Sequence, residues 1–153
     1  MRLRPACAVA ISLLVAAPAT AAIVPGRGVG GATIGMSPAQ ARAALGAPRS
    51  SLHGTNDFGP WVEYRYPNVV VSFQSGTGAT TITTGSRTER TGKGIGVGST
   101  VAELTQRITG ARCLTELDHR HCYVGRWMPG EIVTDFSIRG ERIVQVTVGR
   151  VLD

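Results

Sequence analysis

The chain has 153 residues, of which 42% are hydrophobic and 17% are charged, and its formal net charge is +6. A chain of this length can build one compact domain, whereas two independent domains of half the size would each be marginal. The basic residues are scattered and almost all are arginines, so they do not form the clustered positive groove or helix of nucleic-acid binders. We therefore expect no nucleic-acid partner, and we attribute the modest basicity to solubility.

Residues 1–22 have the pattern of a secretory signal peptide. Two arginines precede an apolar run over residues 6–17, and small residues follow over 18–22. The run is shorter than the roughly 20 residues needed to span a bilayer. Cys7 lies too early in it to become a lipid-bearing N-terminal residue. We predict a secreted or periplasmic protein without stable membrane insertion, with a single domain over residues 23–153.

The first half of the mature chain predicts a flexible lead-in followed by a short helix. Residues 23–31 are rich in glycine and contain one proline, a composition typical of loops. Ser37 is a suitable N-cap, and Gln40 three positions later completes a capping box. Pro38 fits the first helical position because its missing N–H would have no partner there. Gly46 ends the predicted helix.

After this helix the hydrophobic period changes to two, which indicates strands. Residues 61–66 alternate in polarity, residues 69–73 form an apolar run, and residues 79–84 are rich in β-branched side chains. A Ser-Gly-Thr-Gly turn separates the last two strands. The polar segment 85–94 is predicted to link the two halves of the chain.

The second half repeats this order. Thr100 and Glu103 form a second capping box, and the apolar positions that follow line one helical face, which ends at Gly110. Strands are predicted over residues 120–124, 131–138 and 142–148, with a tight turn at Arg139-Gly140. The segments 34–40 and 97–103 correspond to each other, and they define two repeats over about 31–85 and 94–150.

Two cysteines remain after signal cleavage, and they predict a disulfide. An even pair in an oxidising compartment normally closes, so we favour a bridge between Cys113 and Cys122. The alternative is a metal site formed by His119, His121 and Cys122. We expect no metal and no cofactor.

Strand alternation divides the predicted sheet into a buried face and an open face. The buried face should contain Val62, Tyr64, Val69, Val71, Phe73, Ile82, Phe136, Ile138, Val144, Val146 and Val148. The open face should contain Trp61, Glu63, Arg65, His119, His121 and Tyr123, and Trp127 should lie in the loop after the strand. Tryptophan, tyrosine and arginine are typical of protein-binding surfaces.

Two catalytic hypotheses have little support in the sequence. The glycine-rich segment 93–100 places its lysine before the glycines, whereas a phosphate-binding loop needs it at the helix start. A hydrolase would need a positioned nucleophile, yet the chain has no G-x-S-x-G motif. We therefore expect no enzymatic activity.

The paired motif Gly35–Gly46 and Gly98–Gly110 resembles the helix-opening motif of the β-lactamase inhibitory protein-like fold, which is shared with SmpA/OmlA small outer-membrane lipoprotein domains. The resemblance implies an α+β fold of two tandem α/β repeats, with short capped helices packed on one side of a curved antiparallel sheet. It also implies a concave face that grips another protein and a disulfide placed like Cys113–Cys122. Ser50 stands where the first repeat of such proteins would begin a bridge.

From these features we expect a secreted, non-enzymatic, monomeric protein-binding module that uses the open face of its sheet, in the manner of an inhibitor. The expected partner-binding residues are Trp61, Arg65, His119, His121, Tyr123 and Trp127. One alternative is an envelope-associated structural or assembly protein. Another is an unrecognised extracellular hydrolase.

Overall fold

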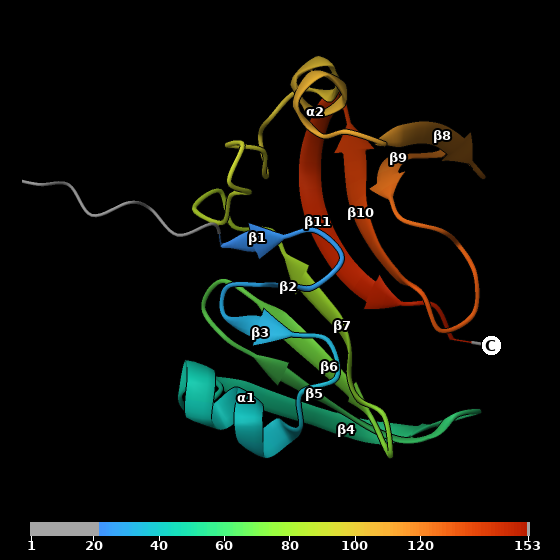
Figure 1. Cartoon of the computed structure of the whole chain (residues 1–153). Helices are drawn as coiled ribbons and strands as arrows, with labels where there is room; N and C mark the ends of the chain where they lie inside the picture. Colours follow the sequence, from blue (N-terminus) through green and yellow to red (C-terminus); the bar gives the residue numbers. More distant parts are fainter. Residues whose placement is uncertain (1–21, 153) are drawn as a thin grey trace, which may run out of the picture.

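The computed structural model describes residues 22–152, and the predicted signal peptide lies outside the described residues apart from Ala22. In this part of the chain we find eleven strands and two helices (Figure 1). In chain order they are β1 (Ile23–Val24), β2 (Gly28–Val29), β3 (Ala32–Thr33), α1 (Pro38–Leu45), β4 (Ser50–Asn56), β5 (Gly59–Arg65), β6 (Val70–Gln74), β7 (Gly78–Thr84), α2 (Val101–Arg107), β8 (Arg112–Glu116), β9 (His119–Val124), β10 (Ile132–Arg139) and β11 (Arg142–Arg150).

Eight strands form one large sheet in the order β4-β5-β6-β7-β11-β10-β9-β8, and every neighbouring pair is antiparallel. The four strands of each half are therefore contiguous, and the halves meet where β7 pairs with β11. Ile82 lies opposite Val148 in this central pair. The sheet twists and curls, so that its two ends are steeply inclined to each other (Figure 1).

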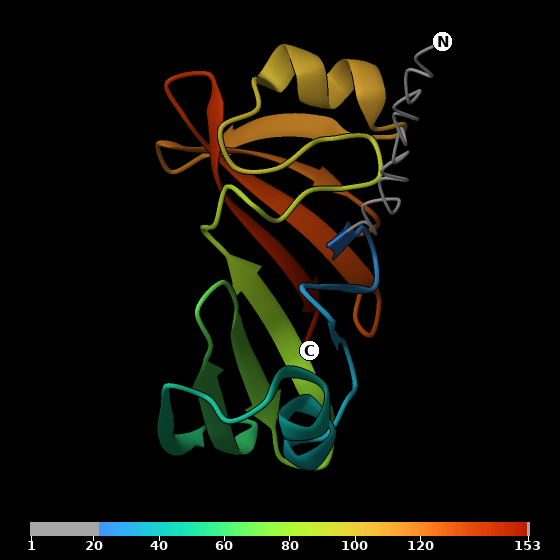
Figure 2. The same cartoon turned by 90° about the vertical axis from the view of Figure 1, so that its left-hand side faces the viewer.

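The predicted α+β fold class is wrong. The structure is mainly β, with α1 of eight residues and α2 of seven, and a separate three-stranded sheet β1-β2-β3 adds further strand. The helices alone do not cover the large sheet: they lie near its two ends, and the small sheet lies between them (Figures 1 and 2). Of the eight residues of α1, only Ala41 is buried.

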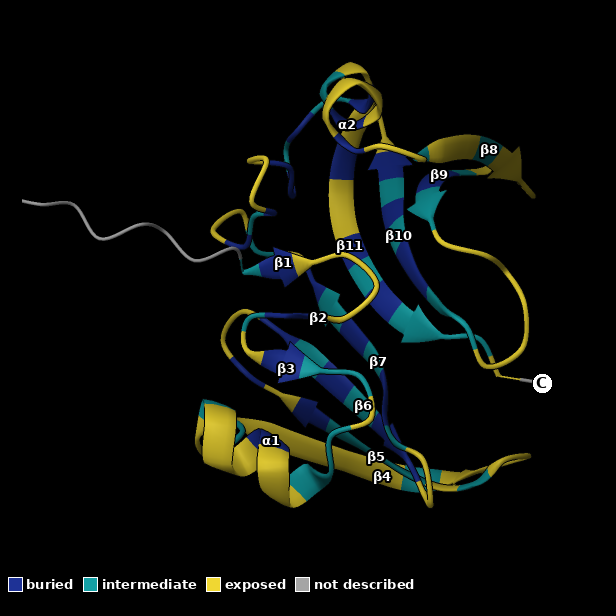
Figure 3. Cartoon of the chain, in the orientation of Figure 1, coloured by how far each residue is buried: buried dark blue, intermediate teal, exposed yellow. Residues whose placement is uncertain are grey.

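The hydrophobic core lies between the large sheet and this composite layer. Phe136, Val146 and Val148 supply fully buried side chains from the sheet. Ile23 from the small sheet and Leu104 from α2 close the core on the other side. Buried positions run along the central strands, whereas β4 and the outer side of α1 are exposed (Figure 3).

The sequence predicted a flexible lead-in over the glycine-rich segment 23–31, and this prediction is wrong. The segment pairs into the small sheet, and Ile23 and Val29 are buried. The Ile23 amide donates a hydrogen bond to the Arg90 carbonyl, which ties the small sheet to the segment between the halves. Gly28 is required here, because a side chain at this position would overlap the backbone of β3.

Both predicted capping boxes are confirmed. The Ser37 hydroxyl accepts from the Gln40 amide, and the Gln40 side chain accepts from the Ser37 amide. Thr100 and Glu103 make the same reciprocal pair at α2. These motifs are local in sequence, which is why they could be recognised without knowledge of the fold.

The alternation rule is correct for most of the buried face but wrong for Val144, which is 39% exposed. The register of β10 and β11 shifts between Ser137 and Ile138, so an extra residue is inserted in β11. Ile143 therefore takes the buried place opposite Ile138. A bulge of this kind inverts the side-chain pattern beyond it.

Candidate functional site

Four of the predicted site residues form one cluster at the second half of the sheet. His119, His121 and Tyr123 follow one another on the same face of β9, and Trp127 returns from the loop after this strand. The ring centroids of His121 and Tyr123 are 6.1 Å apart, and those of Tyr123 and Trp127 are 5.8 Å apart. We call these four residues the aromatic–histidine cluster.

His121 lies deeper in this cluster than its strand position indicated. It is only 8% exposed, whereas Trp127 and the adjacent Met128 are 53% and 52% exposed. The ring of Trp127 lies edge-on to His121, with 6.4 Å between the centroids. The sequence showed that Trp127 follows the strand, but the path of the loop that brings it back was not visible in it.

Asp135 is a site residue that the sequence analysis missed. Its carboxylate hydrogen-bonds with Nδ1 of His121 across the β9–β10 pair. The other ring nitrogen, Nε2, lies 4.0 Å from the Glu116 carboxylate on β8. Alternation places Asp135 on the same face as Tyr123, its direct partner in the register. Recognising the pair therefore required the register as well as the sequence.

The ring of His121 is oriented as in a general base, but no nucleophile is paired with it among the described residues. A carboxylate at Nδ1 fixes the ring and favours a proton at that nitrogen, which is the arrangement of many catalytic histidines. Among the described residues, however, no serine, threonine or cysteine makes a hydrogen bond to Nε2.

The predicted disulfide is confirmed between Cys113 on β8 and Cys122 on β9. The two residues are direct partners in the register, and Cys122 is fully buried. Because its sulfur is oxidised and Cys122 belongs to the core, it cannot supply a thiolate to a metal beside His119 and His121.

Trp61 and Arg65 are not part of the cluster. They lie on β5, and four strands separate β5 from β9 in the sheet, which is roughly 24 Å at the usual spacing between strands. The Arg65 side chain is paired with Glu63. The indole of Trp61 packs against Gly54 on β4, where an added Cβ would lie 2.7 Å from the ring. The predicted binding face is thus divided into two patches.

A small pocket opens beside the cluster on the same face. Its volume is about 190 Å³, and it lies over the central strands β7, β11 and β10. It is lined by Thr81, Trp127, Val133, Asp135, Thr147, Gly149, Arg150 and Val151. We call it the Asp135 pocket.

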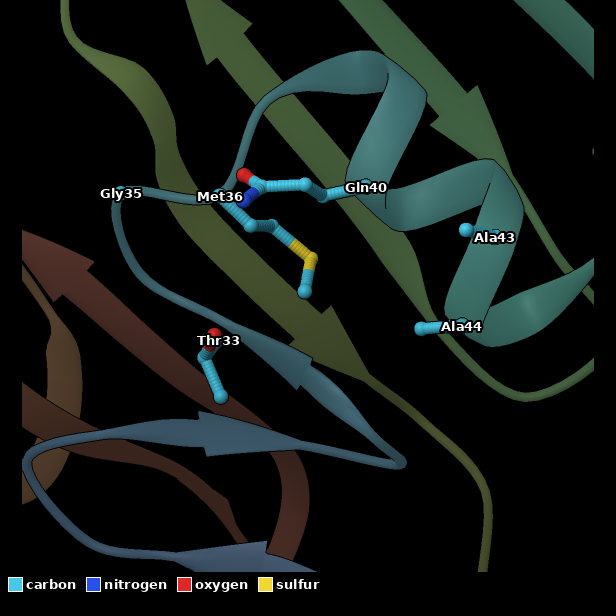
Figure 4. Close-up of a pocket in the computed structure, with 6 residues that line it drawn as sticks. All are labelled: Thr33, Gly35, Met36, Gln40, Ala43 and Ala44. Carbon is cyan, nitrogen blue, oxygen red and sulfur yellow. The ribbon is translucent and has the colours of Figure 1, made fainter.

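A wider hollow lies between β3 and α1, with a volume of about 640 Å³. Figure 4 shows the side chains of Thr33, Met36 and Gln40 around it, with two alanines of the helix. No titratable side chain lines this hollow, and Gln40 is already engaged in the helix cap. It offers no acid, base or charged group for catalysis.

No protein-family model matches the chain, and no curated protein matches it. Among solved structures, the uncharacterized protein yfeY from Escherichia coli is similar with a TM-score of 0.51 and 16% identity over 82% of this chain and 97% of that one. A cysteine-rich secretory protein from Staphylococcus aureus is similar with a TM-score of 0.48 and 10% identity, over 82% of this chain. An extracellular protein containing a SCP domain from Bacillus anthracis matches 76% of this chain with a TM-score of 0.48 and 11% identity.

These likenesses concern the fold alone, because all the identities are low. This chain spans only about half of the length of the Staphylococcus and Bacillus proteins, at 47% and 44%. None of the three is described as a β-lactamase inhibitory protein or as a SmpA/OmlA domain. The resemblance to that family therefore stays a prediction.

Proposed function

We propose that the protein is an extracytoplasmic, non-enzymatic module that binds another protein through the aromatic–histidine cluster. The observation that carries this proposal is the association of a half-exposed Trp127 and Met128 with two further rings on one sheet face. Tryptophan, tyrosine and methionine are enriched in the centres of protein interfaces. Ion pairs such as Arg126–Glu131 lie beside this apolar centre and supply the polar rim of an interface.

The extracytoplasmic location is supported by the disulfide and by the pattern of residues 1–22. Disulfides persist in oxidising compartments and are rare in the cytosol. Among residues 22–152 no helix is long and apolar enough to cross a membrane.

A hydrolase is the second candidate, and the His121–Asp135 pair is the observation that favours it. We prefer the binding function because Nε2 of His121 faces the Glu116 carboxylate rather than a hydroxyl. The test is a screen of esterase, amidase and glycosidase substrates with the wild type and His121→Ala. Turnover that is lost in the variant would establish the enzyme instead.

If the protein binds its partner through the aromatic–histidine cluster, substitutions in the cluster should weaken binding, whereas substitutions in the patch on β5 should not. Mature oxidised protein is used to capture partners from the culture medium and envelope of the source, and affinities are then measured with the purified partner. Truncating a central aromatic side chain typically costs about 2 kcal/mol or more in binding. We expect this loss for Tyr123→Ala and Trp127→Ala, and none for Trp61→Ala, which serves as the matched control. Equal binding by all three variants would show that the cluster is not the interface.

A further inference from the structure

The strand β4 forms an open edge of the large sheet. It pairs with β5 on one side, and on the other side it meets no strand of the described residues (Figure 3). The Pro60 carbonyl on β5 accepts from the Ser75 amide, which immediately follows β6, so Pro60 faces β6. Successive residues of a strand face opposite neighbours, so Trp61 faces its register partner Gly54 on β4. The N–H and C=O groups that β4 directs outward are therefore those of Ser51, His53 and Thr55.

The edge at β4 lacks the features that keep natural edge strands unpaired. Such strands usually carry charged side chains, a proline or a bulge. From Ser50 to Asn56 there is no lysine, arginine, aspartate, glutamate or proline, and the register with β5 is continuous. The other edge strand, β8, carries Arg112 and Glu116. Of the two edges, β4 is therefore the one that can accept a further strand.

A second copy of β4 is complementary to this edge. Two copies related by a two-fold axis pair antiparallel, and their overlap is complete when the axis passes at His53, the middle residue of the strand. His53 is then opposite His53 of the partner subunit, and Ser51 is opposite Thr55 of the partner subunit. Each of these outward-facing residues both donates and accepts a backbone hydrogen bond in this register.

Opposite charges meet at both ends of the same register. Arg49 precedes β4 and Asp57 follows it, and both residues are exposed. Within residues 22–152 neither side chain forms an ion pair. With the axis at His53, Arg49 of each copy is opposite Asp57 of the partner subunit, because the two residues are equally far from the axis. Any other register moves these charges out of line, so the charge pattern favours a second copy in this register.

The side chains on the open face are also complementary. In this register Leu52 of each copy is opposite Gly54 of the partner subunit. The Trp61 indole covers Gly54, since an added Cβ there would lie 2.7 Å from the ring. Leu52 is 45% exposed and can pack against this indole across the two strands. The same apolar contact occurs twice by symmetry.

We propose that the protein forms a symmetric dimer in which β4 pairs antiparallel with β4 of a second copy and joins the two large sheets into one. This dimer replaces the monomer that we expected from the sequence. The interface is a single strand pair with few side chains, and small interfaces of this kind are weak, so the dimer should have a Kd on the order of 100 µM. The protein is then monomeric at the low micromolar concentrations used in denaturation experiments. The aromatic–histidine cluster on β9 lies toward the other edge of the sheet and stays free.

The test measures the mass of the oxidised mature protein as a function of its concentration. Sedimentation from about 5 µM to about 1 mM should show a monomer that converts to a dimer, given the expected Kd. Over the same range the amide NMR signals of Ser51, His53 and Thr55 should shift. His53→Pro removes the backbone donor at the axis and should weaken the dimer at least tenfold. The monomer tolerates this proline, because the N–H that it removes points outward from an edge strand.

An exchange of charges tests the register. Arg49→Asp and Asp57→Arg each place like charges opposite one another, so each should weaken the dimer at least tenfold. The double variant Arg49→Asp/Asp57→Arg restores opposite charges and should dimerise like the wild type. Glu116→Arg on β8 is the matched control, since it makes the same change of charge at the other edge of the sheet and should leave dimerisation unchanged. Circular dichroism checks that each variant is folded.

A wild type that stays monomeric at about 1 mM overturns the proposal, because that concentration is well above the expected Kd. A dimer that His53→Pro leaves intact, or that the double exchange does not restore, is formed by another surface and also overturns it. If the β4 amides shift only when a captured partner is added, the edge accepts a strand of that protein and not a second copy. The proposed function is measured with Tyr123→Ala and Trp127→Ala, which lie outside this interface, so either proposal can fail without the other.

Discussion

Two neighbouring tyrosines show how single polar atoms decide stability. Tyr64 and Tyr66 are both buried, with their rings 6.4 Å apart. The Tyr64 hydroxyl accepts a hydrogen bond from Nε of Arg42, whose guanidinium also lies over the ring. The Tyr66 hydroxyl is buried without a partner. A buried group in this state costs about 1–3 kcal/mol, whereas a satisfied one contributes about 1 kcal/mol.

The two tyrosine-to-phenylalanine substitutions should therefore change the free energy of unfolding in opposite directions. Tyr66→Phe removes an unsatisfied hydroxyl without changing the shape of the core, so the free energy of unfolding should stay equal or rise by about 1 kcal/mol. Tyr64→Phe loses the hydrogen bond from Arg42, so it should lower the free energy of unfolding by about 1 kcal/mol. Urea denaturation followed by circular dichroism measures both. A destabilised Tyr66→Phe would mean that this hydroxyl has a partner.

The same hydroxyl predicts a pH dependence. Burial raises the pKa of Tyr66, Tyr64 adds to the rise, and Arg42 opposes it. The unfolded chain then ionises before the folded one, so the neutral phenol stabilises the fold below its ordinary pKa of about 10. This stability is lost as the pH rises through the folded pKa. Tyr66→Phe should lose less stability than the wild type between pH 9 and about 11.

The two helix caps have the same chemistry, but the helices that they begin differ in how many residues they bury. Val101 and Leu104 of α2 are buried, whereas α1 buries only Ala41. Removing an N-cap hydroxyl costs typically about 1 kcal/mol. We expect Thr100→Ala to lower the global unfolding free energy by this amount. Ser37→Ala should have a smaller global effect, because α1 can fray without opening the core.

The cap of α2 also responds to acid. The backbone N–H of Thr100 lowers the pKa of Glu103, and the Thr100 hydroxyl lowers it further. Burial opposes this shift, and Arg107 and Arg142 add to it. A lowered pKa means that this stabilisation is present above the ordinary value and is lost as the pH falls through the folded pKa. NMR titration of the Glu103 side chain should show a pKa below the ordinary value of a glutamate.

The disulfide belongs to β8, an edge strand that pairs only with β9. Closing a loop of about ten residues stabilises a fold by roughly 2–3 kcal/mol in the chain-entropy account. The double variant Cys113→Ala/Cys122→Ala should lose this stability in urea denaturation, and amide exchange should rise mainly in β8. The reduced wild type is the control and should behave like the variant. If amide exchange in β8 were unchanged, the disulfide would not be what stabilises the pairing of this strand with β9.

The strands differ in how well the sequence predicted them. β6, β7, β10 and β11 have apolar alternation because one face of each is buried, and all were expected at nearly their observed positions. β4 and β8 were missed. They are the two edges of the sheet, and most of their residues are exposed on both faces, so no period-two pattern marks them.

At the scale of the whole molecule, the same limitation explains the wrong fold class. The capped helices were visible because their signals span four residues, whereas the two-residue strands of the small sheet carry no pattern at all. The cluster was predicted in part for a similar reason. Strand alternation grouped His119, His121 and Tyr123, but the pairing of His121 with Asp135 depends on a register between strands that the sequence does not display.

The pairing of β7 with β11 should make the two halves unfold together. Ile82 and Val148 are fully buried opposite each other at this junction, and one continuous core extends across it. Trp61 lies in the first half and Trp127 in the second, so Trp127→Phe and Trp61→Phe leave one fluorescent reporter in each. Both reporters should show the same urea midpoint, as expected of a two-state transition.

Ile82→Ala tests the junction directly. Truncating a buried isoleucine costs about 2–5 kcal/mol, and because both halves share this contact the midpoints of both reporters should fall by the same amount. Leu52→Ala is the control, since Leu52 is exposed on the edge strand β4 and its loss should leave both midpoints unchanged. If Ile82→Ala lowers only the Trp61 midpoint, the second half is stable without the first. The β7–β11 pair would then join two separate folding units rather than lie within one.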